Sequence, residues 1–279
     1  MDERYSIPRR IWRILYPPLI FIAVQLFTVG AAGFVIIVLF LTNGSLGFEH
    51  MMEMDAIIEE AVKLVNEQSL LILLFSNLIN IVVFLPVWMK TRKRIEPRAN
   101  TRPGAIVMLT IGLFATFNTV QMILFSLVDV MKFFPSYEEV SEVFETGSFA
   151  IQLLAIGVCA PIVEELVFRA ILINRMKWLP IWGAVLIQGV LFGLVHLNVF
   201  QGLYAFVAAL LLGLIYIKFH SVIIVIIGHM AYNLTSLILA ELASEEAMGI
   251  AIMASIVMLP ICAILAAKHK KAQSLNYHT

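Results

Sequence analysis

The stretch FAIQLLAIGVCAPIVEELVFRAILI, residues 149–173, places three charged residues inside a segment that is otherwise apolar. A charged side chain near the centre of a bilayer costs about 2.5–3.5 kcal/mol on insertion scales, so Glu164, Glu165 and Arg169 need partners. Glu165 and Arg169 lie four residues apart and can pair on one helix face. Glu164 lies about 100° around the helix from Glu165 and has no local partner. This stretch predicts a membrane-spanning helix that carries a functional carboxylate.

The composition of the whole chain indicates a membrane protein. Of 279 residues, 61% are hydrophobic and 14% are charged, and the mean hydropathy is +0.94. A soluble chain of this length needs far more polar surface. Eight apolar stretches are long enough, or nearly so, to cross about 30 Å of hydrocarbon; they are residues 15–42, 69–89, 105–131, 148–175, 181–198, 202–217, 220–240 and 248–267. The predicted fold is an all-α, polytopic membrane bundle of about eight transmembrane helices.

The charges are distributed unevenly between the two sides of this predicted bundle. With the N-terminus inside, nearly all Lys and Arg residues fall on one side, in residues 1–14, 90–104, 174–180, 218–219 and 268–279. Most acidic residues fall on the other side, within residues 49–67, 138–145 and 241–246. By the positive-inside rule, both termini are expected in the cytoplasm. We expect an integral, multi-pass protein of the plasma membrane, with its first stretch an anchor and not a cleaved signal.

Within the outer segment 43–68, whose role the sequence leaves open, residues 49–67 have apolar side chains at helical spacing. It is expected either on the membrane surface or as a helix packed on the bundle. The two cysteines, Cys159 and Cys262, lie within predicted spans and resemble small buried apolar residues. Neither feature assigns chemistry, and nothing in the sequence indicates a nucleic-acid partner.

Polar residues at membrane depth form two further groups, FGLVH (192–196) and HMAYN (229–233). Phe192 and His196 are predicted to share one helix face, and His229 and Asn233 share another. A single His or Asn in a membrane is usually a hydrogen-bonding device between helices. Two carboxylates, two imidazoles and an amide on neighbouring spans are better explained by one shared polar cavity.

Such a cavity has the groups that peptide-bond hydrolysis requires. A carboxylate beside an imidazole can take a proton from water and pass it to a leaving group. A second His and an Asn can donate hydrogen bonds to an oxyanion. Alternatively, Glu164, His196 and His229 could hold Zn²⁺ with an open position. The HExxH spacing of soluble zinc proteases is absent, so the cofactor is expected to be either none or zinc.

The order EELVFR (164–169), FGLVH (192–196), HMAYN (229–233) on successive apolar helices resembles the CPBP intramembrane proteases. This family is also called the Abi or type II CAAX prenyl endopeptidase family. The resemblance covers residues 148–240 and implies a catalytic core there. It is preceded by a three-helix region (1–147) with a basic loop at 90–104, and followed by a last helix and tail (241–279).

The resemblance also implies a role for each motif residue. Glu164 would be the catalytic base and would activate water together with His196. Glu165 and Arg169 would complete this catalytic set by orienting it and balancing its charge. His229 and Asn233 would form the oxyanion hole. The family is named for metalloproteases, although its prenyl-protease branch resembles glutamate-dependent hydrolases. The expected substrate is a membrane-associated protein or peptide at the lipid bilayer.

The predicted depths of these residues agree only in part. Counted from Arg175 and Lys218, Glu164 and His229 each lie about 16 Å along their helices, whereas His196 lies about 24 Å from Pro180. A tilted fifth helix, or a recessed connection LNVFQG (197–202), would bring His196 to the others. We therefore expect a water-filled pocket that opens towards the cytoplasm.

Two other classes of function fit the same polar residues. In a non-catalytic scaffold, the cluster would hold the bundle together while the protein regulates a partner by contact. In a proton-coupled transporter, Glu and His would form a proton relay. The chain has no obvious inverted repeats and no paired broken helices, which argues against the transporter.

Overall fold

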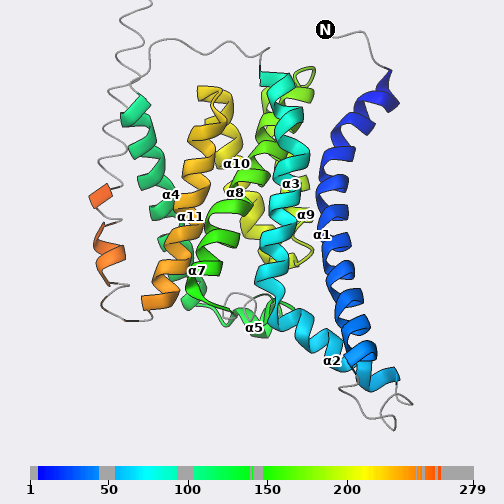
Figure 1. Ribbon diagram of the computed structural model, residues 1–279. Helices are drawn as coiled ribbons and strands as arrows, with labels where there is room; N and C mark the ends of the chain where they lie inside the picture. The colour runs from blue at the N-terminus through cyan, green and yellow to red at the C-terminus, as the bar shows by residue number, and fades with distance from the viewer. Residues whose placement is uncertain are drawn as a thin grey trace, which may run out of the picture.

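A computed structural model describes residues 6–43, 54–92, 103–138, 140, 147–242, 244, 246, 249–254 and 257–258. All of its elements are helical, which confirms the predicted helical membrane bundle (Figure 1). The elements are α1 (Ile7–Asn43), α2 (Met54–Glu67), α3 (Ser69–Arg92), α4 (Pro103–Ser126), α5 (Val130–Phe133), α7 (Phe149–Gln152), η2 (Leu153–Cys159), α8 (Ala160–Glu165), η3 (Leu166–Ile173), α9 (Ile181–Leu194), α10 (Val199–Phe219) and α11 (Val222–Leu242).

Within the described residues, 6 helical spans are long and apolar enough to cross a membrane. One of them is the continuous run Phe149–Ile173, which comprises α7, η2, α8 and η3. Helix α9 is apolar but has only 14 residues. The predicted span 248–267 lies largely outside the described residues, so the expected total of eight stays a prediction.

The predicted boundaries of the fifth and sixth spans were wrong by several residues. Helix α9 ends at Leu194, four residues before the predicted end at 198, and α10 begins at Val199. Leu197 has a φ of 56°, which no α-helix accommodates, so the chain turns there. Asn198 then caps α10, because its side chain accepts a hydrogen bond from the Gln201 N–H at 3.1 Å.

The run Phe149–Ile173 lies at the centre of the bundle. In Figure 1, α8 stands between α11 and α3, with α1 on the outside of α3 and α4 on the outside of α11. Every residue of η3 is buried. Helices α9 and α10 pack closely on one another because Gly193 and Gly202 face each other. A Cβ at either position would lie 2.7–2.8 Å from the other residue's carbonyl oxygen.

Helix α2 packs on the bundle, mainly against α1 (Figure 1). Ile57 and Ala61 are buried on its inner face. Of the two alternatives for this outer segment, the described part, Met54–Glu67, is therefore a helix packed on the bundle.

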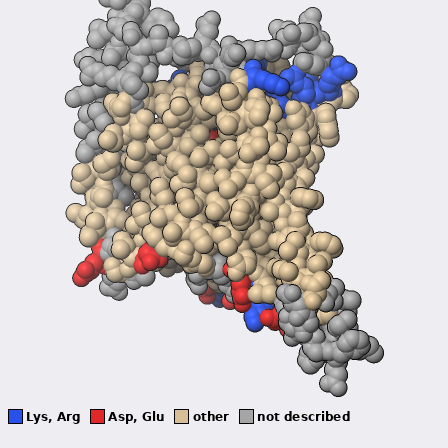
Figure 2. All heavy atoms as spheres, in the orientation of Figure 1, with Lys and Arg blue, Asp and Glu red and all other residues tan. Residues whose placement is uncertain are grey.

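Charged side chains gather at the two ends of the bundle and are rare on its sides. Figure 2 shows basic residues at the end where the chain begins and mainly acidic residues at the opposite end, separated by a band with almost no charge on the surface. This separation is the one expected from the sequence for a bundle in a bilayer. The assignment of the basic end to the cytoplasm stays a prediction.

Candidate active site

The central span changes its hydrogen-bonding pattern just before the two glutamates. Segment η2 is π-helical, and the N–H of Ala160 accordingly donates to the carbonyl of Ala155, five residues earlier. In the same pattern the carbonyl of Ile156 would accept from residue 161. Residue 161 is a proline and has no N–H to donate. The sequence thus leaves one backbone carbonyl at membrane depth in need of a donor.

Asn233 of α11 supplies this donor. Its Nδ2 donates to the Ile156 carbonyl at 2.8 Å. The two helices come this close because residue 157 is a glycine, where a Cβ would lie 2.6 Å from Leu234. The contact between α11 and the central span thus depends on three groups, which are Pro161, Gly157 and the side-chain amide of Asn233. They hold Asn233 beside the helix that carries both glutamates.

Glu165 and Arg169 form the ion pair expected from their spacing. The distance from Arg169 Nη1 to Glu165 Oε1 is 2.9 Å, and both side chains are fully buried. The guanidinium also lies over the Phe192 ring, 4.6 Å from its centroid. Its Nη2 approaches the Ala209 carbonyl of α10 at 3.5 Å. Arg169 is thus surrounded by groups that stabilise a cation from three directions.

His229 lies between the two glutamates. Its Nδ1 is 2.8 Å from Glu165 Oε1, a hydrogen-bonding distance at which a protonated Nδ1 donates to the carboxylate. Its Nε2 is 3.6 Å from Glu164 Oε2, which is too long for a direct hydrogen bond and close enough for an ion pair when the imidazole is protonated. Glu165 Oε1 therefore contacts both Arg169 and His229. The Glu164 side chain is 14% exposed, whereas Glu165 is completely buried.

His196 lies in the turn after α9, not within the helix as predicted. Its Nδ1 contacts the Phe192 carbonyl at 2.7 Å, so in the neutral tautomer with N–H at Nδ1 the other nitrogen, Nε2, is the acceptor. The Phe192 ring lies 5.0 Å from the His196 ring and 5.9 Å from the His229 ring, measured between centroids. The two imidazoles thus flank one aromatic ring. The water-mediated link between Glu164 and His196 stays a prediction.

The chain just after His196 contacts another part of the protein, although Leu197 in the same turn is 73% exposed. Asn198 donates from Nδ2 to the Ser136 carbonyl at 2.9 Å. Phe200 packs on Phe125, Phe134 and Tyr137, with ring centroids 4.7–5.1 Å apart. A helix of 14 residues is only about 21 Å long, so α9 ends short of a full crossing. The recessed connection expected from the sequence stays a prediction.

The side-chain arrangement does not fit the zinc alternative. His229 directs one ring nitrogen at Glu165 and the other towards Glu164. Across the described part of the chain, no three His, Cys, Asp or Glu side chains are grouped as metal ligands. Glu164, His196 and His229 are therefore not gathered around one ion in this geometry, and the cofactor, none or zinc, stays a prediction.

Sequence reasoning missed two residues that shape the site. Pro161 creates the carbonyl that Asn233 binds, and its signal was a proline inside an apolar span. Gln188 is fully buried in α9 and donates to the same Ala209 carbonyl that Arg169 approaches. Its signal was a single amide in an otherwise apolar helix.

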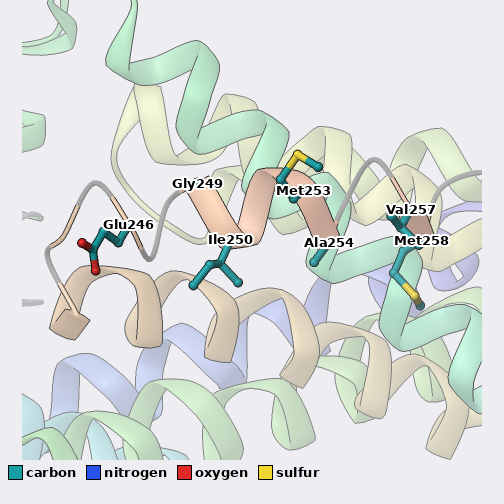
Figure 3. A pocket seen from close by; sticks show the side chains of 7 residues that line it. All are labelled: Glu246, Gly249, Ile250, Met253, Ala254, Val257 and Met258. Carbon is teal, nitrogen blue, oxygen red and sulfur yellow. The ribbon is translucent and has the colours of Figure 1, made fainter.

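A groove on the described surface lies away from this polar cluster. It has a volume of about 650 Å³ and is lined by the residues labelled in Figure 3, namely Glu246, Gly249, Ile250, Met253, Ala254, Val257 and Met258. Its lining is almost entirely apolar, and none of the candidate catalytic side chains reaches it. We therefore assign it no part in the chemistry.

Comparison with known families singles out the part of the chain that contains the cluster. Residues 146–235 match the family model described as type II CAAX prenyl endopeptidase Rce1-like. No curated protein and no solved structure matches the chain. All the motif residues discussed above lie within the matched range, and at the family level the match supports an intramembrane endopeptidase. The resemblance inferred from the three motifs is thereby confirmed: residues 146–235 match the type II CAAX prenyl endopeptidase, Rce1-like, family.

Proposed function

We propose that this protein is an intramembrane endopeptidase that uses water activated by Glu164 and His196 to hydrolyse a peptide bond of a membrane-associated substrate. The observation that carries the proposal is the chain of contacts from Arg169 through Glu165 to His229, beside Glu164. These contacts lie in the part of the chain that matches the endopeptidase family.

The two adjacent glutamates have different environments, which supports a division of labour. Glu165 is fully buried, and its Oε1 contacts both Arg169 and His229. Glu165 balances the charge of Arg169 and orients the His229 ring, and its buried carboxylate is not available to a substrate. Glu164 is partly exposed, and its recorded ion-pair distance, to His229 Nε2, is 3.6 Å. Its carboxylate is the one that can meet water, so Glu164 is the base and Glu165 the positioning residue.

The reaction that follows from these assignments is balanced without a side-chain nucleophile. Glu164, assisted by His196 Nε2, takes a proton from water, and the resulting hydroxide attacks the carbonyl carbon of the scissile bond. Hydrogen bonds stabilise the tetrahedral oxyanion. When the C–N bond breaks, the proton held at Glu164 passes to the leaving amine. The products are a new carboxylate and a new amine.

His229 and Asn233 are the donors to the oxyanion. Asn233 uses one amide hydrogen on the Ile156 carbonyl, which leaves the second available to a substrate oxygen. His229 donates through Nε2 in its doubly protonated form, with Glu165 holding Nδ1. Removal of one oxyanion donor in other hydrolases lowers kcat by about 10²–10³.

Peptide cleavage by the purified full-length protein tests the proposal. The substrates are a peptide with a C-terminal prenylated cysteine motif and the same peptide without the lipid, since the expected substrate lies at the membrane. We expect Glu164→Gln and His196→Ala each to lower kcat at least about 10²-fold. Glu241→Gln, an exposed glutamate near the end of α11, is the matched control and should retain full activity. Normal cleavage by Glu164→Gln would reject Glu164 as the base.

Chelation separates this mechanism from the zinc alternative. Since Glu164, His196 and His229 do not group as metal ligands, cleavage should survive exhaustive chelation. Loss of cleavage that is restored by Zn²⁺ and by no other divalent ion would contradict the metal-free mechanism. Full cellular function of Glu164→Gln at normal expression would instead favour the scaffold.

A further inference from the structure

Gln188 is a buried amide at the contact between α9 and α10. Its side chain has no solvent exposure, although the rest of α9 is apolar. Nε2 donates to the Val185 carbonyl of its own helix at 3.0 Å and to the Ala209 carbonyl of α10 at 2.8 Å. The two carbonyls fix the amide in one orientation. Burying an amide inside a membrane protein is costly, so its place needs a reason.

The Ala209 carbonyl is also the backbone group that Arg169 approaches, with Nη2 at 3.5 Å. Gln188 and Arg169 therefore meet at one oxygen atom. Gln188 Oε1 and Arg169 Nε, an acceptor and a donor, are both buried without a hydrogen-bond partner among the described residues. The amide and the guanidinium thus share one backbone acceptor, the Ala209 carbonyl.

Helix α10 is shaped to admit this amide. Residue 213 is a glycine, and a Cβ there would lie 2.7 Å from Gln188 Nε2 and 3.5 Å from Val185. A heavy-atom approach of 2.7 Å between carbon and nitrogen is impossible without displacement, so an alanine at 213 would push the amide off the Ala209 carbonyl. Gln188 and Gly213 form a matched pair across the contact between the two helices.

We propose that Gln188 is a positioning residue of the candidate active site, acting through Arg169 and Glu165 on His229. Gln188 holds the Ala209 carbonyl, which the guanidinium approaches through Nη2, and Arg169 Nη1 pairs with Glu165 Oε1 at 2.9 Å. The same Oε1 binds His229 Nδ1 at 2.8 Å. The effect of Gln188 on kcat rests on the proposed function, whereas its effect on the orientation of the His229 ring does not.

The competing explanation is that Gln188 only holds α9 to α10. A purely structural amide would affect the stability of the bundle and leave the His229 ring unchanged. Gly189→Ala provides a matched control, because its new methyl would press on Leu210 and Phe206 at 3.0–3.2 Å in the same helix contact. This control perturbs the packing of α9 on α10 and keeps the amide.

The first measurement reads the His229 ring directly in the full-length protein in detergent. Histidine is labelled with ¹⁵N, and the His229 signals are assigned as those lost in His229→Gln. We expect Gln188→Met, which keeps the side-chain length and removes the amide, to shift both ring-nitrogen signals of His229. Gly189→Ala should leave them in place. Unchanged His229 signals in Gln188→Met would overturn the proposal, whether or not the protein cleaves peptides.

The second measurement uses the peptide-cleavage assay. Gln188→Met should lower kcat about tenfold with KM unchanged, because the amide positions groups and does not bind substrate. Gly213→Ala should have the same effect, and the double variant should be no worse than either single one. A shifted His229 signal in a protein that cleaves nothing would reject the proposed function and keep the positioning role. If Gln188→Met cleaves with normal kcat and leaves the His229 signals unshifted, the positioning role is rejected and the proposed function is kept.

Discussion

Helix α1 and the central span Phe149–Ile173 are both apolar enough to cross a membrane, yet they are built differently. Helix α1 is one unbroken helix of 37 residues, and none of its most apolar window is buried in the protein. The central span is divided among α7, η2, α8 and η3, and more than half of its window is buried. Helix α1 is therefore expected to face mainly lipid, whereas the central span is surrounded mainly by other helices.

This difference explains where the polar chemistry resides. A helix that faces lipid has to satisfy its backbone internally and expose apolar side chains. A helix surrounded by protein can carry charges and an altered hydrogen-bonding pattern, because neighbours provide the missing partners. Asn233 supplies one such partner to Ile156, and Arg169 supplies another to Glu165. Substitutions in the two spans should therefore have very different effects.

The largest effect is expected at Arg169. Arg169→Met leaves the fully buried Glu165 without its cation, which should lower the free energy of unfolding by about 3–5 kcal/mol. Unfolding of the detergent-solubilised protein in denaturant measures this change. Arg9→Met, at the exposed start of α1, should change the stability by less than about 0.5 kcal/mol. Equal losses at the two positions would contradict the contrast between the spans.

A second variant separates charge from packing at this site. Glu165→Gln combined with Arg169→Met removes both charges and should recover much of the lost stability, since no uncompensated charge stays buried. Cleavage should not return, because His229 would still lack its carboxylate. Recovery of both stability and cleavage would contradict the role of Glu165.

The next effect is expected at Asn233. Asn233→Ala removes the donor to the Ile156 carbonyl and one proposed oxyanion donor. We expect kcat to fall about 10²–10³-fold and the free energy of unfolding to fall by about 1–3 kcal/mol. Steady-state cleavage measures the fall in kcat, and unfolding in denaturant measures the fall in the free energy of unfolding. Asn118→Ala is the control. It breaks a hydrogen bond from α4 to Ser236 of α11, the helix that carries Asn233, and should lower the stability while leaving kcat unchanged.

A smaller effect is expected where α11 meets the central span. Gly157→Ala places a methyl group 2.6 Å from Leu234, which should push α11 outwards and lower stability by about 1–3 kcal/mol. Leu234→Ala in the same protein makes room for that methyl and should restore cleavage towards the wild-type rate. If the losses of stability and of cleavage in the double variant equal the sum of those in the single variants, the close approach of residues 157 and 234 is not the cause of the effect.

The smallest effect is expected at the two prolines of α1. Pro17 and Pro18 lie inside the helix, and their replacement by alanine restores two backbone donors. We expect kcat/KM within about twofold of wild type, because α1 contributes none of the candidate catalytic side chains. The cleavage assay measures this ratio. A change of tenfold or more would mean that α1 controls the site.

The sequence predicted the helical bundle, the charge separation and the Glu165–Arg169 pair, because each follows from local spacing or composition. It could not predict the contact between His229 and Glu165, since 64 residues separate them and only packing brings them together. It also placed His196 inside a helix, because the apolar pattern continues through the residues where φ turns positive at Leu197. The partner of Asn233 depends on a missing N–H at Pro161, which hydropathy does not register.

The short helix α9 has a consequence for the surrounding lipid. Its exposed stripe, Trp182, Leu186, Val190 and Leu194, offers the bilayer an apolar surface only about 21 Å long, against about 30 Å of hydrocarbon. Lipids beside α9 therefore meet a hydrophobic mismatch, which a bilayer relieves by thinning. We expect this thinning beside α9, the helix that leads into the turn carrying His196. Under the proposed function, a polar substrate chain would cross less hydrocarbon there than beside the longer helices.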